Sequence, residues 1–381
     1  MTRDKISFLF EQRFGQTPTA ISTAPGRIEI IGNHTDYNGG CVIGAGIDRH
    51  VWVAASPAIS QNIRLASGPT GPVIEIDPRH EGRFSGPEAW ANFPFGAWRS
   101  LQDFDLPRPP AFDLLILSDL PEGAGLSSSA ALELATALAL LHLAGQSGPA
   151  PADLAAIGRH AENTYVGVPC GILDQGVSAY ARKNHLVHID CRAPAFSLLP
   201  FPPAACFWIF NSMEKHALSD GHYAARNREC QEAAVILGVP WLVDLTDTSL
   251  AKGTHLLSGA QSKRARHVVE ENARVARAVT ALEAHDLVAL GQLLTASHLS
   301  SQHLFENSTP ALDSLVDLLH RQPGVHGARL TGGGFGGAVV ALTTDRFGTA
   351  QADLVAQQHT AHGHPRPDVI SLRTADGARL L

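Results

Sequence analysis

Residues 121–131 read Pro-Glu-Gly-Ala-Gly-Leu-Ser-Ser-Ser-Ala-Ala, and a long apolar stretch follows them directly. Glycines have no Cβ, so their backbone N–H groups can approach an anion closely and adopt positive φ. Serine hydroxyls at the start of a helix add to N–H groups and a helix dipole that already favour negative charge. Because the apolar run Phe112–Leu117 precedes the motif, we expect a strand, a glycine-rich turn and a helix that together cradle phosphate. The alternative is an ordinary glycine-rich turn with a serine N-cap.

Two further blocks contain clustered glycines: Ala24–Gly40, with the sequence APGRIEIIGNHTDYNGG, and Gly327–Gly337, with the sequence GARLTGGGFGG. In this order, with the serine loop between them, they resemble the three signature motifs of the galactokinase family of GHMP small-molecule kinases. The resemblance extends through Trp90–Phe93 and Val166–Gln175 to Asp376–Ala378, and so covers nearly the whole chain. It implies an α/β (α+β type) fold of two domains. The N-terminal domain would be ribosomal-protein-S5-like and the C-terminal domain ferredoxin-like, with the active site between them.

The composition agrees with a two-domain globular enzyme. The 381 residues exceed the size at which a single hydrophobic core usually stops growing. The Pro-rich segment 200–203 is the best boundary, which predicts domains 1–200 and 201–381. Between the motifs, the periodicity predicts strands at 41–55 and 73–76 that belong to a meander, and a buried strand at 204–210. Helices are expected at about 127–144, 151–165, 219–237, 261–284 and 286–300.

Charge and cysteine usage narrow the partners. The formal net charge of −7 argues against a nucleic-acid partner. The five cysteines are scattered without CxxC spacing, which fits reduced thiols and a cytoplasmic location. The charged N-terminus is not followed by an apolar signal segment, and the longest apolar stretch, Ala130–Ala144, is too short to span a bilayer. We therefore expect ATP and a small sugar as partners, and no membrane.

The third glycine block offers a competing interpretation. Gly332, Gly334 and Gly337 satisfy G-x-G-x-x-G, which in a dinucleotide-binding fold is followed at once by a helix. Here the β-branched run 338–343 predicts a strand instead. We therefore reject the nicotinamide enzyme, and expect a tight turn that another backbone or a ligand can approach.

Two residues are the candidates for catalysis. Asp174 lies in an apolar neighbourhood, where a carboxylate needs a partner or a role. The role available in phosphoryl transfer to an alcohol is to accept or orient the hydroxyl proton. The resemblance implies that Asp174 is the catalytic base; otherwise it is a turn-capping residue. Arg27 would hold Asp174 ionised and stabilise the charge that passes between sugar and phosphate.

The resemblance also implies the metal and nucleotide contacts. Glu162 and Ser129 would ligate Mg²⁺, since a small octahedral ion prefers hard oxygen ligands. The alternative for Glu162 is a solvent-facing helical carboxylate. ATP would be bound by the glycine and serine loop, with Ser67 as a weaker candidate: Gly123, Ala124, Gly125, Leu126, Ser127, Ser128 and Ser129.

Sugar contacts are expected from Asn33, His34, Thr35 and Asp36, which cluster at a strand end, and from Tyr223, which matches a sugar-binding tyrosine of the family. The chain departs from the family here. Galactokinases usually carry Gly-Glu-His-Thr-Asp, whereas this chain has Asn33 in place of Glu, and Glu29 where Asn is common. A neutral amide also donates hydrogen bonds, so position 33 would alter which C6 substituent is accepted. Uronic acids would then be excluded less strictly.

A histidine cluster near the C-terminus, His359, His362 and His364, could in principle bind metal. It has no flanking acidic or cysteine partners, and we expect it to lie in a solvated loop.

The sequence thus predicts a Mg²⁺-dependent kinase that transfers the γ-phosphoryl group of ATP to the anomeric hydroxyl of galactose. The alternatives are a 1-kinase for N-acetylgalactosamine, galacturonate or arabinose, and a sensor that binds sugar and ATP without turnover. The intact serine loop, Glu162 and Asp174 together favour the enzyme.

Overall fold

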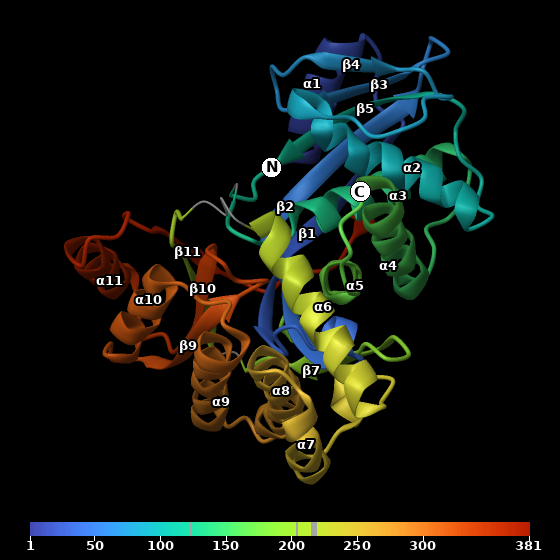
Figure 1. The fold of residues 1–381 in the computed structure, drawn as a ribbon. Helices are drawn as coiled ribbons and strands as arrows, with labels where there is room; N and C mark the ends of the chain where they lie inside the picture. Colours follow the sequence, from blue (N-terminus) through green and yellow to red (C-terminus); the bar gives the residue numbers. More distant parts are fainter. Residues whose placement is uncertain (122, 203–204, 215–218) are drawn as a thin grey trace.

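The computed structural model describes residues 1–121, 123–202, 205–214 and 219–381, and within these ranges it forms two β-sheets with helices packed around them (Figure 1). The first sheet has the order β12-β1-β2-β5-β3-β4, with β6 on β2 and β7 on β6. Its strands are β1 (Ala20–Ile31), β2 (Cys41–Pro57), β3 (Ile63–Ser67), β4 (Val73–Ile76), β5 (Phe112–Ser118), β6 (His185–Asp190), β7 (Ala195–Pro200) and β12 (Arg379–Leu380). The second sheet has the order β11-β8-β10-β9. Its strands are β8 (Cys206–Asn211), β9 (Val325–Thr331), β10 (Ala338–Thr343) and β11 (Asp368–Leu372).

The long strands β1 and β2 form the centre of the first sheet. β1 is buried along its whole length, and β2 pairs with β5 through its second half and with β6 through its first half. The predicted strands at 41–55 and 73–76 are confirmed, but the meander is wrong. β5 and β3 separate β2 from β4, and β3 runs parallel to β5. The short strand β3 gives no clear alternating pattern in the sequence, which is why the expectation missed it.

The helices pack on and between the sheets. Their bounds are α1 (Arg3–Phe14), α2 (Asn92–Asp103), α3 (Ser128–Leu143), α4 (Pro151–His160), α5 (Leu173–Tyr180), α6 (Ser219–Leu237), α7 (Asp247–Gly253), α8 (Gly259–Glu283), α9 (Leu287–Ser300), α10 (Pro310–His320) and α11 (Thr349–Ala361). α3 is apolar on all sides because it packs against β1, β2, α2 and α4. The five helices named from the sequence are all present, the second of them as α4 followed by a π-helical turn, η3 (Ala161–Val166).

The arrangement of the elements brings the three glycine motifs to the middle of the molecule. α6 lies across this middle, between the part that carries α2–α4 and the part that carries α9–α11 (Figure 1). The chain ends in the first sheet, where β12 pairs with β1. The expected strand at 204–210 is present as β8, while its first position, residue 204, lies outside the described residues.

Over the described ranges, no helix is both long enough and apolar enough to cross a membrane.

Candidate active site

Two adjoining cavities lie where the three motifs meet. The smaller has a volume of about 240 Å³ and is lined by the sugar motif, Glu162, Cys170 and part of the third glycine block. The larger has a volume of about 670 Å³ and is lined by the serine loop and the rest of that block. Arg27, Asp174 and Tyr223 line both cavities. A group transferred from one cavity to the other would therefore pass Asp174 and Arg27.

Asp174 is held by two partners from different motifs. Arg27 donates from Nε and Nη2 to Asp174 Oδ1, at 2.8 and 2.7 Å. Ser127 Oγ donates to Oδ2 at 2.5 Å. Arg27 is buried, so the interpretation as a solvated surface arginine is excluded, and its Nη1 also donates to the carbonyl of Gly125. The ion pair fixes the position of the Asp174 carboxylate at the boundary of the two cavities.

The serine loop is a turn with positive φ at three positions, and it lies on the wall of the larger cavity. Gly123 and Gly125 have φ of +69° and +65°, and a Cβ added at either would meet no atom within 4 Å. Ser127 adopts the left-handed conformation at φ 56°, and Ser128 begins α3. Every predicted loop contact from Gly123 to Ser129 lines the larger cavity. Ser67 does not: it ends β3 as an exposed residue outside the lining of both cavities.

Glu162 lies on the π-helical turn η3 and is buried, so it is not a solvent-facing carboxylate. Gln175 Nε2 donates to it at 2.5 Å and to the neighbouring Glu133 at 3.1 Å. Burial and the charge of Asp174 raise the pKa of Glu162 to about 7, while a hydrogen bond from Ser129 opposes that shift. Across the described residues, no Lys or Arg lies within 4.0 Å of Glu162. A buried carboxylate beside a serine hydroxyl, without a cation, fits a small divalent ion.

The sugar motif forms a turn at the end of β1. Asp36 lines the smaller cavity, and burial together with the charges of Glu29 and Asp174 raises the pKa of Asp36 to about 7. Asp36 packs closely against Gly171, because a Cβ added there would lie 1.8 Å from Asp36 Oδ2. Tyr223, on α6, also lines the cavity, and its ring packs 5.2 Å from that of His34.

His34 lines the same cavity, but both of its ring nitrogens are engaged by the protein. Nε2 lies 3.0 Å from the carbonyl of Gly333, and Nδ1 lies 2.9 Å from the hydroxyl of Tyr37. A carbonyl only accepts, so Nε2 carries the proton and Nδ1 accepts from Tyr37. Burial lowers the pKa of His34 to about 3, so the ring is neutral. One face of the His34 ring stacks on Phe305, with ring centroids 4.3 Å apart, so only the part of the ring that lines the cavity remains for a ligand.

Thr35 is the one predicted sugar-binding residue that does not line either cavity. It is fully buried, does not line either cavity, and its hydroxyl lies 2.7 Å from the carbonyls of both Gly32 and Cys41. This geometry does not favour the expected direct contact between Thr35 and the sugar. A hydroxyl in a tight turn satisfies the backbone, and Thr35 thereby fixes the turn that carries its neighbours.

Asn33 is also buried and lines the cavity, but its amide is bonded to protein. It donates to Glu29 and to the carbonyl of Gly332, and accepts from Ser301 and Asn307. The C6 contact expected from this amide would therefore displace an existing partner. The third glycine block approaches the sugar motif closely, as expected for that turn. The carbonyls of Gly332 and Gly333 therefore accept hydrogen bonds from Asn33 and His34.

Sequence reasoning missed a buried ionic network behind the sugar motif. Arg329, on β9, donates to Glu29 at 3.1 Å, and both side chains are buried. Glu271, on α8, accepts from the backbone N–H groups of Gly32 and Asn33 at 3.0 and 3.2 Å, and pairs with Arg274 at 2.7 Å. Burial raises the pKa of Glu29 and the Arg329 guanidinium opposes that shift. The only signal in the sequence is a charged residue inside an apolar strand, as at Glu29 and Arg329.

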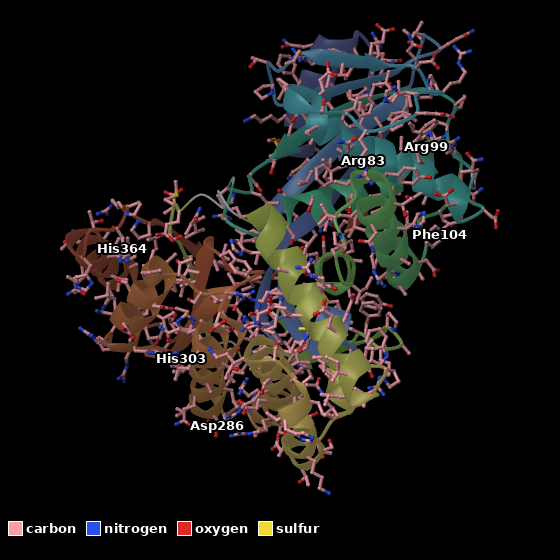
Figure 2. The ribbon with its side chains drawn as sticks, in the orientation of Figure 1. Arg83, Arg99, Phe104, Asp286, His303 and His364 are labelled. Carbon is pink, nitrogen blue, oxygen red and sulfur yellow. The ribbon has the colours of Figure 1, made fainter. Side chains whose placement is uncertain are left out.

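The histidine cluster lies away from these cavities. His364 is at the outer edge of the molecule beside α11 (Figure 2). The expected solvated loop is wrong for His359, which is buried in the last turn of α11 and stacks on His364 with ring centroids 4.6 Å apart. Burial lowers the pKa of His359 to about 4. Its ring packs towards α10, where His359 Nδ1 lies 3.3 Å from Ser314 Oγ.

Comparisons with known proteins match both halves of the chain. A galactokinase galactose-binding signature matches residues 9–57, a GHMP kinase N-terminal domain matches 92–182, and a GHMP kinase C-terminal domain matches 278–364. A galactokinase of Chloroflexus aurantiacus is 40% identical over 365 residues, which cover 90% of each chain. A galactokinase of Bos taurus is 36% identical over 379 residues, which cover 98% of this chain and 95% of the relative.

Solved structures give the same result for the fold. The crystal structure of Lactococcus lactis galactokinase complexed with galactose superposes with a TM-score of 0.94 at 32% identity, over 99% of both chains. The Methanococcus jannaschii mevalonate kinase superposes with a TM-score of 0.65 at 18% identity, over 93% of this chain and 98% of that one. At that identity the second likeness concerns the fold alone. The expected two-domain GHMP kinase fold is thereby confirmed.

Proposed function

The chain belongs to the galactokinase family of GHMP kinases, and from this premise we propose that it transfers the γ-phosphoryl group of ATP to the anomeric hydroxyl of galactose, giving galactose 1-phosphate and ADP. The observation that carries the proposal is the position of Asp174 and Arg27 on the wall shared by two cavities. One cavity offers a phosphate cradle and the other a polar pocket of sugar size.

In this proposal the residues of the chain act in a defined order. The serine loop binds the phosphates of ATP through its backbone N–H groups and hydroxyls. Asp174 accepts or orients the proton of the anomeric hydroxyl as the phosphoryl group arrives, and Arg27 holds the Asp174 carboxylate in place. The hydroxyl of Ser127, bonded to Asp174 at 2.5 Å, would exchange that bond for a phosphate oxygen when ATP enters. Asp36, Tyr223 and the part of the His34 ring that lines the cavity contact the sugar.

We also propose that the metal is Mg²⁺, held by Glu162 and Ser129. The donor set supports it, because Glu162 is a buried carboxylate without a cationic partner in the described part of the chain. When bound, the ion neutralises charge on the transferring phosphoryl group. Gln175 orients Glu162 by donating to its Oε2. We further propose a cytoplasmic location, which the five free thiols fit.

The proposal is tested by measuring ADP release with galactose, N-acetylgalactosamine, galacturonate and arabinose. Phosphorus NMR of the product then identifies the phosphorylated oxygen. We expect galactose to give the highest kcat/KM and a phosphate on the anomeric oxygen. A higher kcat/KM with another sugar would select one of the related 1-kinases. Sugar binding without ADP release from any of the four would select the sensor.

A further inference from the structure

Glu29 and Asn33 form a contacting pair on the wall of the smaller cavity. Asn33 Nδ2 lies 3.2 Å from Glu29 Oε1, and the two residues are only 1% and 3% exposed. The family pattern has the same two residue types in the opposite order along the chain. The exchange therefore leaves one carboxylate and one amide at this wall, but it changes which position supplies each.

The amide of Asn33 has no capacity left for a ligand. A primary amide has two N–H donors and one oxygen that accepts twice. The donors bond Glu29 and the carbonyl of Gly332, and the oxygen accepts from Asn307 at 2.9 Å and Ser301 at 3.2 Å. A sugar hydroxyl at Asn33 would leave one of these buried groups unpaired, which is costly. Asn33 therefore acts as part of the protein scaffold.

Glu29 has the capacity that Asn33 lacks. Its Oε1 accepts from Asn33 and from Arg329, at 3.2 and 3.1 Å, while Oε2 has one long contact of 3.4 Å with Asn33. A carboxylate can accept about four hydrogen bonds. Both neighbouring side chains donate to Glu29, which is the environment that a carboxylate requires. Glu29 thus retains capacity to accept a hydrogen bond, and it lines the smaller cavity.

We propose that Glu29, and not Asn33, binds one hydroxyl of the sugar and thereby restricts the substrate to uncharged sugars that carry this hydroxyl. The inference rests on the proposed function and specifies its substrate class. An acceptor-only carboxylate takes an O–H group and repels a carboxylate brought into the same buried cavity. Uronic acids are then excluded strictly, which reverses the expectation drawn from Asn33 alone.

The test pairs protein variants with sugars that lack one hydroxyl each. Calorimetry measures binding of galactose, 2-deoxygalactose, 4-deoxygalactose and 6-deoxygalactose to the wild type and to Glu29→Gln, without ATP. We expect Glu29→Gln to weaken galactose binding about tenfold, since a hydrogen bond to a charged group is replaced by one to a neutral group. The affinity for one of the deoxygalactoses should differ less than twofold between the wild type and Glu29→Gln, because this sugar lacks the hydroxyl that Glu29 binds. Galacturonate should not bind to the wild type at concentrations that saturate with galactose.

Glu271→Gln is the matched control, because Glu271 is a buried carboxylate of the same network that does not line the cavity. This variant should weaken the binding of all four sugars by the same factor. If Glu29→Gln behaves in that way too, Glu29 has only a structural role and the inference is overturned. Binding of galacturonate as tight as that of galactose would also overturn it.

A second variant covers the case in which Glu29→Gln does not fold because Arg329 loses its partner. The double variant Glu29→Asn/Asn33→Glu restores the order of the family and keeps one carboxylate in this contacting pair. We expect it to fold and to discriminate the same deoxygalactose as the wild type, whereas equal binding of all deoxygalactoses would contradict the inference. Because these measurements use binding alone, absence of ADP release would refute the proposed kinase activity without affecting this result.

Discussion

At the scale of single residues, the catalytic proposal depends on the environment of Asp174. Its two oxygens are shared between a buried arginine and a serine of the phosphate loop. An aspartate that only caps a turn has no need of a buried guanidinium at 2.7 Å. The ion pair costs desolvation of two charges, and the proposed role of Asp174 in phosphoryl transfer gives a reason for placing such a pair at the wall of both cavities.

Asp174→Asn should therefore abolish turnover. The amide has nearly the same shape but cannot accept the proton or stay charged beside Arg27, so kcat should fall at least ~10²-fold. Binding of ATP, measured by calorimetry, should change little because the serine loop is intact. Asp153→Asn, at an exposed position on α4, is the control and should behave as the wild type. A variant that keeps more than about a tenth of the wild-type kcat would show that Asp174 is not the base.

The sequence alone is least sufficient for predicting what individual side chains contact. The motif identifies Asn33 as a departure, but only the side-chain contacts show that Asn33 donates to Glu29. Likewise, the pattern includes Thr35 in the sugar motif, while the structure uses its hydroxyl within the turn. A sequence motif gives residue types and their order. It does not give the direction of a side chain, because that depends on partners such as Asn307 and Gly332 from the other end of the chain.

At the scale of elements, periodicity was enough for the long helices and strands and for the short strand β4, but not for all the short elements. α8 and α9 were predicted to within two residues, since amphipathic helices of this length give a clear 3.6-residue pattern. β3 and β11 have five residues each and give no such signal. The π-helical turn η3 was also missed, because the sequence of α4 continues through it without a break. That turn carries Glu162, and π-helical turns occur frequently at functional sites.

Glu162, the proposed Mg²⁺ ligand, lies on this turn. Glu162→Gln should raise the Mg²⁺ concentration needed for half-maximal rate, because a neutral amide is a much poorer ligand than a carboxylate. Binding of Mg²⁺ in the presence of ADP, followed by calorimetry, should weaken in parallel. Glu133→Gln is the matched control. Burial raises the pKa of Glu133 well above its ordinary value, and we expect its replacement by the isosteric Gln to leave the Mg²⁺ requirement unchanged. Equal Mg²⁺ requirements in wild type and Glu162→Gln would remove Glu162 from the site.

The turn between η3 and α5 gives a second prediction at this scale. A Cβ at Gly171 would lie 1.8 Å from Asp36 Oδ2, so Gly171→Ala must displace the Asp36 side chain. We expect the KM for the sugar to rise about tenfold or more, since a small displacement in a binding site has large effects. The KM for ATP should change less than twofold. Gly221→Ala, where an added Cβ meets no atom within 4 Å, is the control and should leave both constants unchanged. Parallel increases in both KM values would instead indicate general loss of structure.

At the scale of the whole molecule, the sugar motif is held from the far side of the chain. Glu271 on α8 accepts from two backbone N–H groups of the turn at Gly32 and Asn33 and from Ser297 on α9. Arg329 on β9 bonds Glu29 on β1. Charged groups buried at this depth are stable only when paired, so segments that are 240 to 300 residues apart must assemble before the turn is fixed. The sequence could not reveal this coupling, because Glu271 lies in no recognised motif and the motifs that contain Glu29 and Arg329 do not show that these two side chains meet.

The stability that Glu271 contributes to this coupling should depend on pH. Arg274, His267 and Arg329 lower the pKa of Glu271 to about 2 against the opposing effect of burial. In the unfolded chain the pKa is 4.5, so the folded state favours the carboxylate and gains stability above that pH. This contribution, up to about 3 kcal/mol, should be lost as the pH falls from about 4.5 towards 2. Glu271→Gln should therefore lower the free energy of unfolding at pH 7, and the difference from the wild type should narrow as the pH falls below 4.5.

Urea denaturation at pH 7, 5, 4 and 3 measures this difference directly. Glu270→Gln, on the partly exposed side of the same helix, is the control and should cost about 1 kcal/mol or less. At pH 7, Glu271→Gln should also raise the KM for the sugar, because the turn at Gly32 loses a charged acceptor. A stability difference that stays constant from pH 7 to pH 3 would contradict the ionised, buried Glu271. A difference that narrows as predicted would mean that one carboxylate both stabilises the fold and positions the sugar turn, since the same two N–H groups are involved in each.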